Sequence, residues 1–321
     1  MMFKRACGLG ALALCALFAG PAMAQAQLDE LTLVAPAAPG GGWDGTARGM
    51  SEVLSQTGLV KSVKVENVPG AGGTVGLAQF VKKSKDPKTV LVFGQIMVGA
   101  VLTNKSPVGL DKVTPLARLT AEWEAIVVPT NSELKTVADL VKKLKENVAG
   151  VTWGGGSAGG TDHICAALFA KAAGVDPSKI NYIAHSGGGE AMASILGGHV
   201  TVGLNGLSEV DPQVKAGKLR YLSVSSDERV PGIDAPTFKE SGIDLSIGNW
   251  RGVVGTPDLA EADKKKLADV LDQMVKSEQW KKKLQEKSWM DNYLSVPQFD
   301  GFLKEENARV SEVLKSVGLV K

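Results

Sequence analysis

The run LTLVAPAAPGGGWDGTAR at residues 31–48 reads as an apolar strand, a glycine-rich turn and the start of a helix. The run WGGGSAGGTDH at residues 153–163 repeats this order about a domain's length further along the chain. Glycine has no Cβ, so each turn can approach a bound group closely, and the next helix offers unpaired N–H groups and a positive dipole end. The two runs predict two halves of one protein that hold a small anion through backbone amides.

Outward from the first run, strands alternate with helices. The segments LTLVAP, VKVENV and VLVFGQ, at residues 31–36, 63–68 and 90–95, have the composition of buried strands. This alternation predicts a parallel sheet with right-handed crossovers. The pattern restarts after Val128, so we predict two α/β units; the alternative is a single continuous sheet without a cleft. Helices are predicted at residues 74–83, 137–146, 162–173 and 190–196.

Two segments are predicted to cross between the units, at residues 117–128 and 250–255. Residues 230–247 are rich in Pro, Gly and Asp, which predicts a surface loop. Helices rich in Lys and Glu are predicted to cover the sheet of the first unit, at residues 261–275, 277–287 and 296–317. Helical spacing defines two buried faces: Ala47, Met50, Val53 and Leu54, and Leu267, Val270, Leu271 and Met274.

The N-terminus has the features of a secretory signal. Lys4 and Arg5 precede an apolar run up to residue 19, and PAMA at residues 21–24 ends it with the small-x-small pattern of a signal peptidase site. We predict cleavage after Ala24 and a periplasmic protein without a membrane span; an uncleaved amphipathic helix is the alternative. We call the two units lobe 1 and lobe 2. The predicted division is a signal peptide at 1–24, the first part of lobe 1 at 25–123, lobe 2 at 124–245 and the rest of lobe 1 at 246–321.

Charge and cysteine content exclude several classes of protein. The chain has 36 Lys and Arg and 34 Asp and Glu, so cleavage after Ala24 removes Lys4 and Arg5 and leaves a mature net charge of zero. We therefore expect no nucleic-acid partner. Cleavage also leaves Cys165 alone, which excludes an internal disulfide and a cysteine-built zinc site. Its apolar neighbours predict a packed core thiol.

Nucleotide binding is one alternative for the glycine turns. Residues 40–45 and 154–159 both match G-x-G-x-x-G, and Glu66 ends the next strand where a ribose-binding acid would lie. Pro36 and Pro39 within the first turn, the lack of such an acid in the second unit and the export signal argue against this interpretation.

Nucleophilic catalysis is a second alternative. Ser157 and Ser186 accompany His163, His185 and His199, but the chain contains no G-x-S-x-G elbow. We predict that His163 braces its loop or caps its helix, and that His185 is the histidine nearest a ligand. The histidines lack the spacing of metal ligands, so we expect no metal site.

Two further glycine turns, PGAGGTVG at residues 69–76 and HSGGGE at residues 185–190, also follow predicted parallel strands. In open α/β sheets ligands bind at this edge, although tight packing alone explains any one such turn. Asp44 and Asp162 stand just inside the helices after the two main turns, where we expect them to orient the loops. Trp43 and Trp153 flank those turns, and we expect each of them either to line a pocket or to cover the hydrophobic core. Three arginines are candidates for pairing with a ligand carboxylate or for ordinary salt bridges: Arg48, Arg118 and Arg251.

The whole mature chain resembles the solute receptors of the tripartite tricarboxylate transporter family, also called Bug-type periplasmic binding proteins. The motifs that carry the resemblance are VAPAAPGGGWDGTAR at 34–48, VENVPGAGGTVG at 65–76, ARLTAEWEAIVV at 117–128, WGGGSAGGTDH at 153–163, GGGEAMASILGGHV at 187–200 and NWRGVVG at 249–255. The resemblance implies the α/β, two-lobed periplasmic binding protein type II fold. Each lobe would be a mostly parallel sheet flanked by helices, and two crossing strands would join the lobes.

The resemblance also implies a binding site. One carboxylate would be pinched between residues 38–44 and residues 157–161 through backbone amides, hydroxyls and water. The GGGWD form resembles the branch that handles citrate-like tricarboxylates, but no cluster of arginines accompanies the loops, which leaves tricarboxylate against dicarboxylate open. The ligand-binding residues that we predict are Ala38, Gly40, Gly41, Gly42, Trp43, Asp44, Gly73, Thr74, Gln95, Ser157, Gly159, Gly160, Thr161, Asp162, Ser186 and Asn205.

The function predicted at this stage is that of a monomeric, exported, solute-binding receptor without catalytic residues or cofactor. Its lobes would close on a small organic carboxylate and present it to a two-component membrane permease. The alternatives are a receptor for a C4-dicarboxylate or another carboxylate that serves a sensor kinase, and an exported enzyme on the same scaffold.

Overall fold

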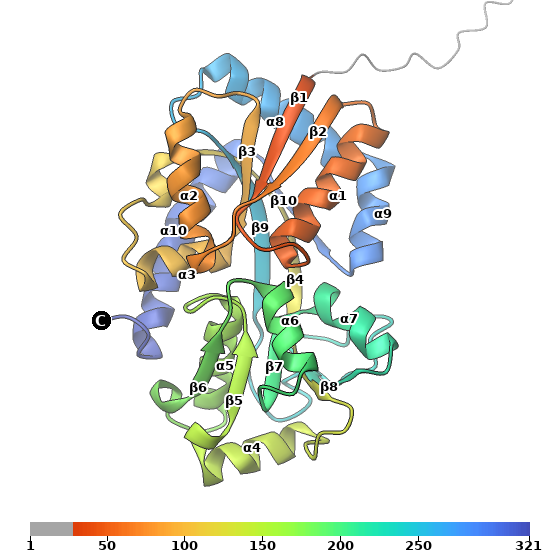
Figure 1. Ribbon diagram of the computed structural model, residues 1–321, viewed down its shortest axis with the longest axis vertical. Helices are drawn as coiled ribbons and strands as arrows, with labels where there is room; N and C mark the ends of the chain where they lie inside the picture. Colours follow the sequence, from red (N-terminus) through yellow and green to blue (C-terminus); the bar gives the residue numbers. More distant parts are fainter. Residues whose placement is uncertain (1–27) are drawn as a thin grey trace, which may run out of the picture.

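The computed structural model describes residues 28–321, which form two α/β lobes, one above the other in Figure 1. The predicted signal peptide and its cleavage site lie outside the described residues. None of the helices within residues 28–321 combines the length and apolar character needed to span a membrane.

Lobe 1 carries the first glycine-rich turn. Strands β1, β2 and β3 are parallel, and β9 pairs antiparallel with β3. The first elements of the lobe are β1 (Leu28–Ala35), α1 (Gly42–Gln56), β2 (Val60–Asn67), α2 (Thr74–Phe80), β3 (Thr89–Gly94) and α3 (Gln95–Thr103). The lobe is completed by β9 (Gly248–Gly255), α8 (Glu261–Lys276), α9 (Glu278–Lys287), β10 (Met290–Leu294) and α10 (Val296–Ser316).

Lobe 2 carries the second glycine-rich turn. Strand β5 lies between β6 and β7 and pairs parallel with both. The elements of the lobe are α4 (Val137–Glu146), β5 (Thr152–Gly155), α5 (Thr161–Ala172), β6 (Asn181–Ala184), α6 (Gly188–Leu196), β7 (Val202–Gly206), α7 (Leu207–Lys215) and β8 (Leu219–Val224).

Strand β4 (Thr114–Pro129) runs through both lobes (Figure 1). Its first part pairs with β9 as far as Trp123, and from Glu124 onward it pairs with β7 and β8. The change of partners occurs between two adjacent residues. β4 thereby links all ten strands into one hydrogen-bonded sheet, and a small cavity lies between the lobes.

The predicted periodicities locate the cores correctly. The face of α1 at Ala47, Met50, Val53 and Leu54 is fully buried, and so is the corresponding face of α8. Strand β3 is buried at every position, as expected of a strand covered on both sides. Burying one Leu or Met side chain contributes about 1.5–3 kcal/mol, so these two faces hold their helices on the sheet.

Some elements differ from the sequence prediction. Residue 95, placed at the end of a strand, begins α3, because β3 ends at Gly94, where a Cβ would overlap the carbonyl of Trp250. Helix α7 was not predicted; it contains Pro212, which removes a helical hydrogen bond and masks the pattern. Lobe 1 is also less parallel than predicted, since β9 is antiparallel to both its neighbours and β10 is antiparallel to β4.

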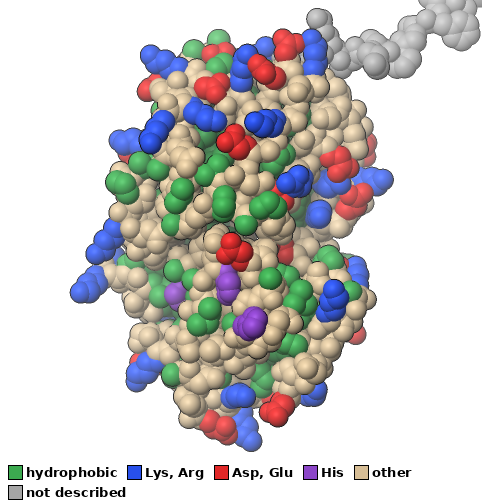
Figure 2. All heavy atoms as spheres, in the orientation of Figure 1, with side chains coloured by type: hydrophobic (Ala, Val, Ile, Leu, Met, Phe, Trp, Pro, Cys, Tyr) green, Lys and Arg blue, Asp and Glu red, His purple; other side chains and the backbone are tan. Residues whose placement is uncertain are grey.

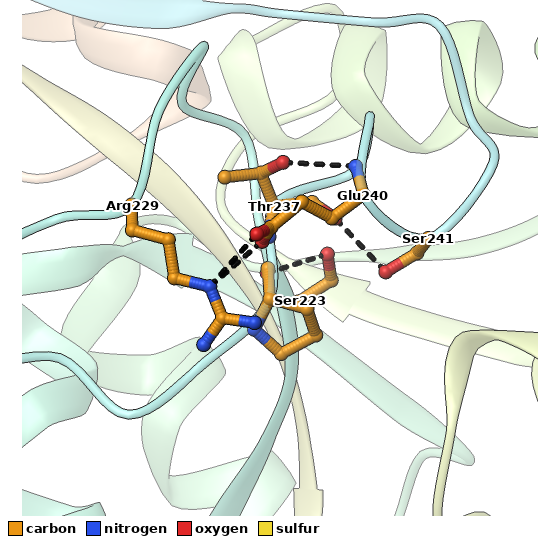
Figure 3. A network of polar contacts seen from close by, with 6 residues as sticks. Ser223, Arg229, Thr237, Glu240 and Ser241 are labelled. Carbon is orange, nitrogen blue, oxygen red and sulfur yellow. Dashed lines mark hydrogen bonds and ion pairs between the residues drawn. The ribbon is translucent and has the colours of Figure 1, made fainter.

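The connection from β8 to β9 is fixed by polar contacts rather than by secondary structure (Figure 3). Arg229 pairs with Glu240 at 2.8 Å, and Glu240 also accepts the backbone N–H of Thr237 at 2.8 Å. The Ser223 hydroxyl donates to the carbonyl of Pro236 at 2.9 Å. Phe238 within this connection is fully buried, so the segment predicted as surface loop is anchored in lobe 2.

Candidate functional site

A small polar cavity of about 30 Å³ lies between the two lobes. Figure 2 shows the surface drawn in at the waist where the lobes meet, with basic and acidic side chains interspersed above and below. This volume has room for a few water molecules at most, so a larger molecule could enter only if the lobes separated. The lining residues are Ala37, Gly42, Trp43, Ile96, Gly156, Ser157, Asp162, Ser186, Gly187, Gly188, Asn205, Glu209, Asn249 and Arg251.

Asp44 holds the first glycine turn in shape. Its carboxylate accepts hydrogen bonds of 2.9 Å from the Gly40 N–H, from Arg48 Nε and from Asn67 Nδ2. Burial alone would raise the pKa of Asp44, but these three donors outweigh it and hold the pKa below its ordinary value. The predicted orienting role of Asp44 is confirmed. Arg48, being paired with Asp44 at the surface, is not part of the cavity wall.

Asp162 and His163 hold the second turn. Asp162 accepts the Gly156 N–H at 2.6 Å, and burial together with the nearby Glu122 raises its pKa to about 6. His163 Nδ1 accepts the Gly159 N–H at 3.1 Å, and its ring stacks on Tyr182 with 4.1 Å between centroids. Burial lowers the pKa of His163 to about 4, so the ring is neutral at physiological pH. The predicted loop-bracing role of His163 is confirmed.

The two main glycine turns border the cavity, but each faces a different element of the opposite lobe. The first turn meets the N-terminus of α6: a Cβ on Gly189 would lie 2.8 Å from the Pro39 carbonyl oxygen. The second turn meets α3: a Cβ on Gly160 would lie 3.0 Å from Ile96 Cγ2. The lobes thus approach closely at two places: the first turn against the backbone of α6, and the second turn against a side chain of α3.

Arg251 is the basic side chain that the cavity wall contributes among residues 28–321. It is 2% exposed and pairs with Glu122, which also accepts the backbone N–H of Ser208 at 3.0 Å. Its Nε and Nη1 atoms have no hydrogen-bond partner within the described chain. A Cβ on Gly42 would overlap the guanidinium, so glycine at the start of α1 is what allows arginine to lie there.

Three other buried polar groups of the wall lack partners within residues 28–321: the indole N–H of Trp43, the side-chain oxygen of Asn249 and the Oε1 atom of Glu209. Trp43 is held from behind by Gly73, since a Cβ on Gly73 would lie 2.8 Å from Trp43 Cζ3. An unpaired buried donor costs about 1–3 kcal/mol. The donors of Arg251 and Trp43 therefore mark a place for an anion.

Acidic side chains surround this arginine. Glu209 lies on the wall with its Oε1 atom buried and unpartnered in the described chain. Burial and the nearby Glu122 raise the pKa of Glu209 to about 8, against an opposing effect of Arg251. Burial, together with neighbouring Asp162, raises the pKa of Glu124 well above its ordinary range. Despite this concentration of acids, no three His, Cys, Asp or Glu side chains within residues 28–321 are arranged to hold a metal ion.

The structure brings together part of the predicted site. Six predicted residues line the cavity: Gly42, Trp43, Ser157, Asp162, Ser186 and Asn205. The other ten are not among the lining residues: Ala38, Gly40, Gly41, Asp44, Gly73, Thr74, Gln95, Gly159, Gly160 and Thr161. Thr161 is fully buried and its hydroxyl has no partner in the described chain.

Sequence reasoning missed the charged half of the wall. It left Arg251 as one of three arginines and did not consider Glu209, Asn249 or the acids of β4. The usable signal was a charged residue inside an apolar strand, as in NWRGVVG at 249–255 and AEWEAIVV at 121–128. Arg118, by contrast, lies over the ring of Phe302 and donates to the carbonyl of Asn292 at 2.8 Å. His185 Nδ1 lies 2.9 Å from the Gly155 oxygen, and its side chain is not part of the wall.

Comparison with known proteins shows which family the sequence matches. The profile of the tripartite tricarboxylate transporter family receptor matches residues 45–319. A protein of Agrobacterium vitis, described as a UPF0065 protein in the TAR-I ttuE-ttuC' intergenic region, is 30% identical over 264 residues, 80% of this chain and 75% of its own length.

Solved structures share the fold. The periplasmic binding protein BugD has a TM-score of 0.82 at 23% identity, covering 91% of this chain and 99% of its own. MatC from Rhodopseudomonas palustris with bound malate has a TM-score of 0.76 at 21% identity, covering 89% and 99%. The predicted fold class is confirmed by these neighbours.

Proposed function

Because the chain belongs to the family of tripartite tricarboxylate transporter receptors, we propose that it captures a small organic carboxylate between its lobes and delivers it to a two-component membrane permease. Proteins of this family are periplasmic solute-binding receptors. The export signal that the sequence predicts at residues 1–24 supports that place of action.

The observation that carries the proposal is Arg251. The Arg251 guanidinium is 2% exposed, and its Nε and Nη1 donors have no partner within residues 28–321, so they can take an acceptor; a carboxylate fits its planar fork. The N-termini of α1 and α6 reach the same cavity through Gly42 and Gly188. These helix ends add partial positive charge to the place that the guanidinium marks.

Capture would follow from movement of the lobes. The connections between them run through β4, where pairing changes at Trp123, and through the strand β9. We propose a division close to 25–123 with 246–321 for lobe 1 and 124–245 for lobe 2, so that both connections act as the hinge. Closure brings the first turn against α6 and the second against α3, which traps the ligand.

The first candidate for the solute is a citrate-like tricarboxylate, which the GGGWD sequence of the first turn supports. A C4-dicarboxylate is a second candidate, because the cavity wall contributes one arginine within residues 28–321 and several acids. The neighbour MatC was solved with malate, a ligand of that size.

Native mass spectrometry of the freshly purified protein tests the proposal directly, because a co-purified solute would appear as a fixed mass increment. Isothermal titration with citrate and with malate then measures affinity. We expect binding well below the millimolar range, with intact ligand recovered afterwards. Absence of any carboxylate binding would contradict the proposed function, and turnover of the ligand would favour an enzyme.

A further inference from the structure

The cavity wall has an unusual charge balance for a site that receives an anion. Glu122 and Glu124 of β4, Asp162 of α5 and Glu209 of α7 lie near Arg251 of β9. If all four acids were ionised, this corner would carry a net charge of minus three before any ligand arrived. Two like charges at 4 Å repel by about 4 kcal/mol even in a moderately polar interior.

Two of the four acids have fixed partners. Glu122 pairs with Arg251 and accepts the Ser208 N–H, which makes it the resident counter-ion of the arginine. Asp162 accepts the Gly156 N–H at 2.6 Å and shapes the second turn. Both carboxylates are therefore committed to structure, and neither is free to adjust when a ligand binds.

Glu209 is placed differently. It lines the cavity, its Oε1 atom has no partner within residues 28–321, and a Cβ on Gly188 would overlap that oxygen. Glu124 is also buried with both carboxyl oxygens unpartnered in the described chain, but it does not line the cavity. Of the four acids, Glu209 is the one that combines contact with the cavity and an uncommitted oxygen.

Independent features point to an anion at the same wall. Arg251, 2% exposed, and Trp43, 5% exposed, both present N–H donors without partners in the described chain. A carboxylate that accepts from them comes to lie beside Glu209. An ionised Glu209 would repel it, whereas a protonated Glu209 carries an O–H that can donate to it.

We propose that the cavity takes up its carboxylate ligand together with one proton, which Glu209 holds and directs at the ligand. The proposal rests on the function proposed above and names a binding condition of that same site.

The surroundings of Glu209 support this assignment. Glu122, Glu124 and Asp162 face it as acids, and Arg251 faces it as the base. Further charged groups on these elements and on α1 and α6 include Asp44 with Arg48 on α1, Asp211 with Lys215 on α7 and Glu190 on α6, and Asp44 and Asp211 are already paired. Burial raises the pKa of Glu209 to about 8 in the closed arrangement.

The sign of the effect follows from closure. When the lobes separate, water reaches Glu209 and its pKa moves down toward the ordinary value of about 4.3. Closing on an anion raises the pKa again, so the bound state holds more protons than the free state. Affinity is therefore highest at low pH and falls by up to about tenfold per pH unit as the pH rises.

Isothermal titration tests the proposal with malate as the probe, because malate is fully ionised between about pH 6.5 and about pH 8. Titrations in phosphate and in Tris, whose ionisation enthalpies differ, give the number of protons taken up. We expect about one proton per malate and an affinity that falls with rising pH. If malate does not bind, citrate replaces it, titrated near the upper end of this pH range where citrate is fully ionised.

Glu209→Gln provides the decisive variant, because its amide stays neutral and can donate as a protonated carboxyl does. It should bind malate with little pH dependence and with no proton uptake. Glu133→Gln is the matched control: it removes an exposed acid of lobe 2 that is not part of the cavity wall, and it should keep the pH dependence.

The outcomes separate the two proposals. Binding without proton uptake in the natural chain, or unchanged uptake in Glu209→Gln, overturns the proton proposal and leaves the receptor function intact. Failure of citrate and malate to bind at any pH counts against the receptor function itself.

Discussion

At the scale of single residues, the site depends on a charged side chain where the strand pattern calls for an apolar one. Arg251 lies in β9 among buried neighbours, and the fold tolerates it because Glu122 of the adjacent strand supplies a counter-ion. Breaking a buried pair by removing one partner costs about 3–5 kcal/mol. The same pair leaves the Nε and Nη1 donors of Arg251 without a partner in the described chain, and these are the donors that we propose for the ligand.

Arg251→Lys keeps the charge that Glu122 needs but removes the planar fork. We expect the protein to fold and its affinity for citrate or malate to fall by about 1.5–3 kcal/mol, roughly 10- to 100-fold, in isothermal titration. Arg118→Lys is the control, since Arg118 lies over Phe302 away from the cavity. Equal losses in both variants would show that Arg251 has no special part in binding.

Gly42→Ala tests the space that the guanidinium occupies. A methyl group at this position overlaps Arg251, so we expect at least a tenfold loss of affinity, about 1.4 kcal/mol or more. Gly45→Ala, in the same helix, meets no atom within 4 Å and should bind normally while stabilising α1 by about 0.5–1 kcal/mol. Normal ligand binding by Gly42→Ala would contradict the placement of Arg251.

At the scale of elements, closure depends on helices and turns that approach without side chains between them. Gly99 of α3 faces the carbonyl of Gly159, and a Cβ on Gly99 would overlap that oxygen. Gly159 itself has a φ of +73°, a left-handed conformation that favours glycine, and a Cβ there would collide with Thr103. The contact between α3 and the second turn is thus specified by glycine on both sides.

Gly99→Ala should leave each lobe folded but hold the lobes apart. The expected results are weaker malate binding and a radius of gyration, measured by small-angle X-ray scattering, that no longer decreases when ligand is added. Gly301→Ala in α10, where a Cβ meets nothing within 4 Å, serves as the control and should close normally. Closure of both variants to the same extent would argue against this contact as part of the closed state.

At the scale of the whole molecule, the lobes share a hydrogen-bonded sheet path and enclose a cluster of titratable groups. The cluster draws on β4, α5, α7 and β9, which come from both lobes. Its charge state is therefore a property of the closed molecule and not of any one element. Stability should respond to pH accordingly.

The free energy of unfolding should fall between about pH 6.5 and about pH 8. Glu209 has a pKa raised to about 8 by burial and by Glu122, so the folded state binds more protons than the unfolded state over this range. Each such proton lowers stability by up to about 1.4 kcal/mol per pH unit as the pH rises. Between about pH 4 and about pH 6.5 His163, whose pKa is lowered to about 4, has the opposite sign and offsets one raised acid, while Asp162, whose pKa is raised to about 6, acts in the same direction as Glu209.

Urea unfolding followed by circular dichroism at several pH values measures this profile. Glu209→Gln should make the fall of stability with rising pH less steep over the whole interval from about pH 4.3 to about pH 8. A natural chain that gains stability from pH 6.5 to pH 8 would contradict the raised pKa of Glu209.

Sequence patterns located the parts of the site that depend on local geometry. Contacts within a few residues shape the glycine turns and place Asp44 and His163 where they hold those turns. The strand pattern identifies the crossing segments at 117–128 and 250–255. Helix α7 was not predicted because Pro212 interrupts its helical pattern, and for that reason Glu209 of α7 was not recognised as a site residue. Glu122 and Glu124 were not recognised as buried acids near the site, because the alternation of residues in a strand does not reveal which polar residue is buried.

Local sequence was enough to specify two α/β units, each opened by a strand, a glycine turn and a helix, since backbone conformation and helix ends are set by neighbours in the chain. The packing of the lobes was needed to show which element each turn faces. The first turn faces α6, and the second turn faces α3. It was also needed to bring Arg251, Glu122, Glu124, Asp162 and Glu209 to one wall. Whether a charged residue is buried and paired depends on how segments more than a hundred residues apart pack against each other. A local sequence pattern does not show which distant segments come into contact.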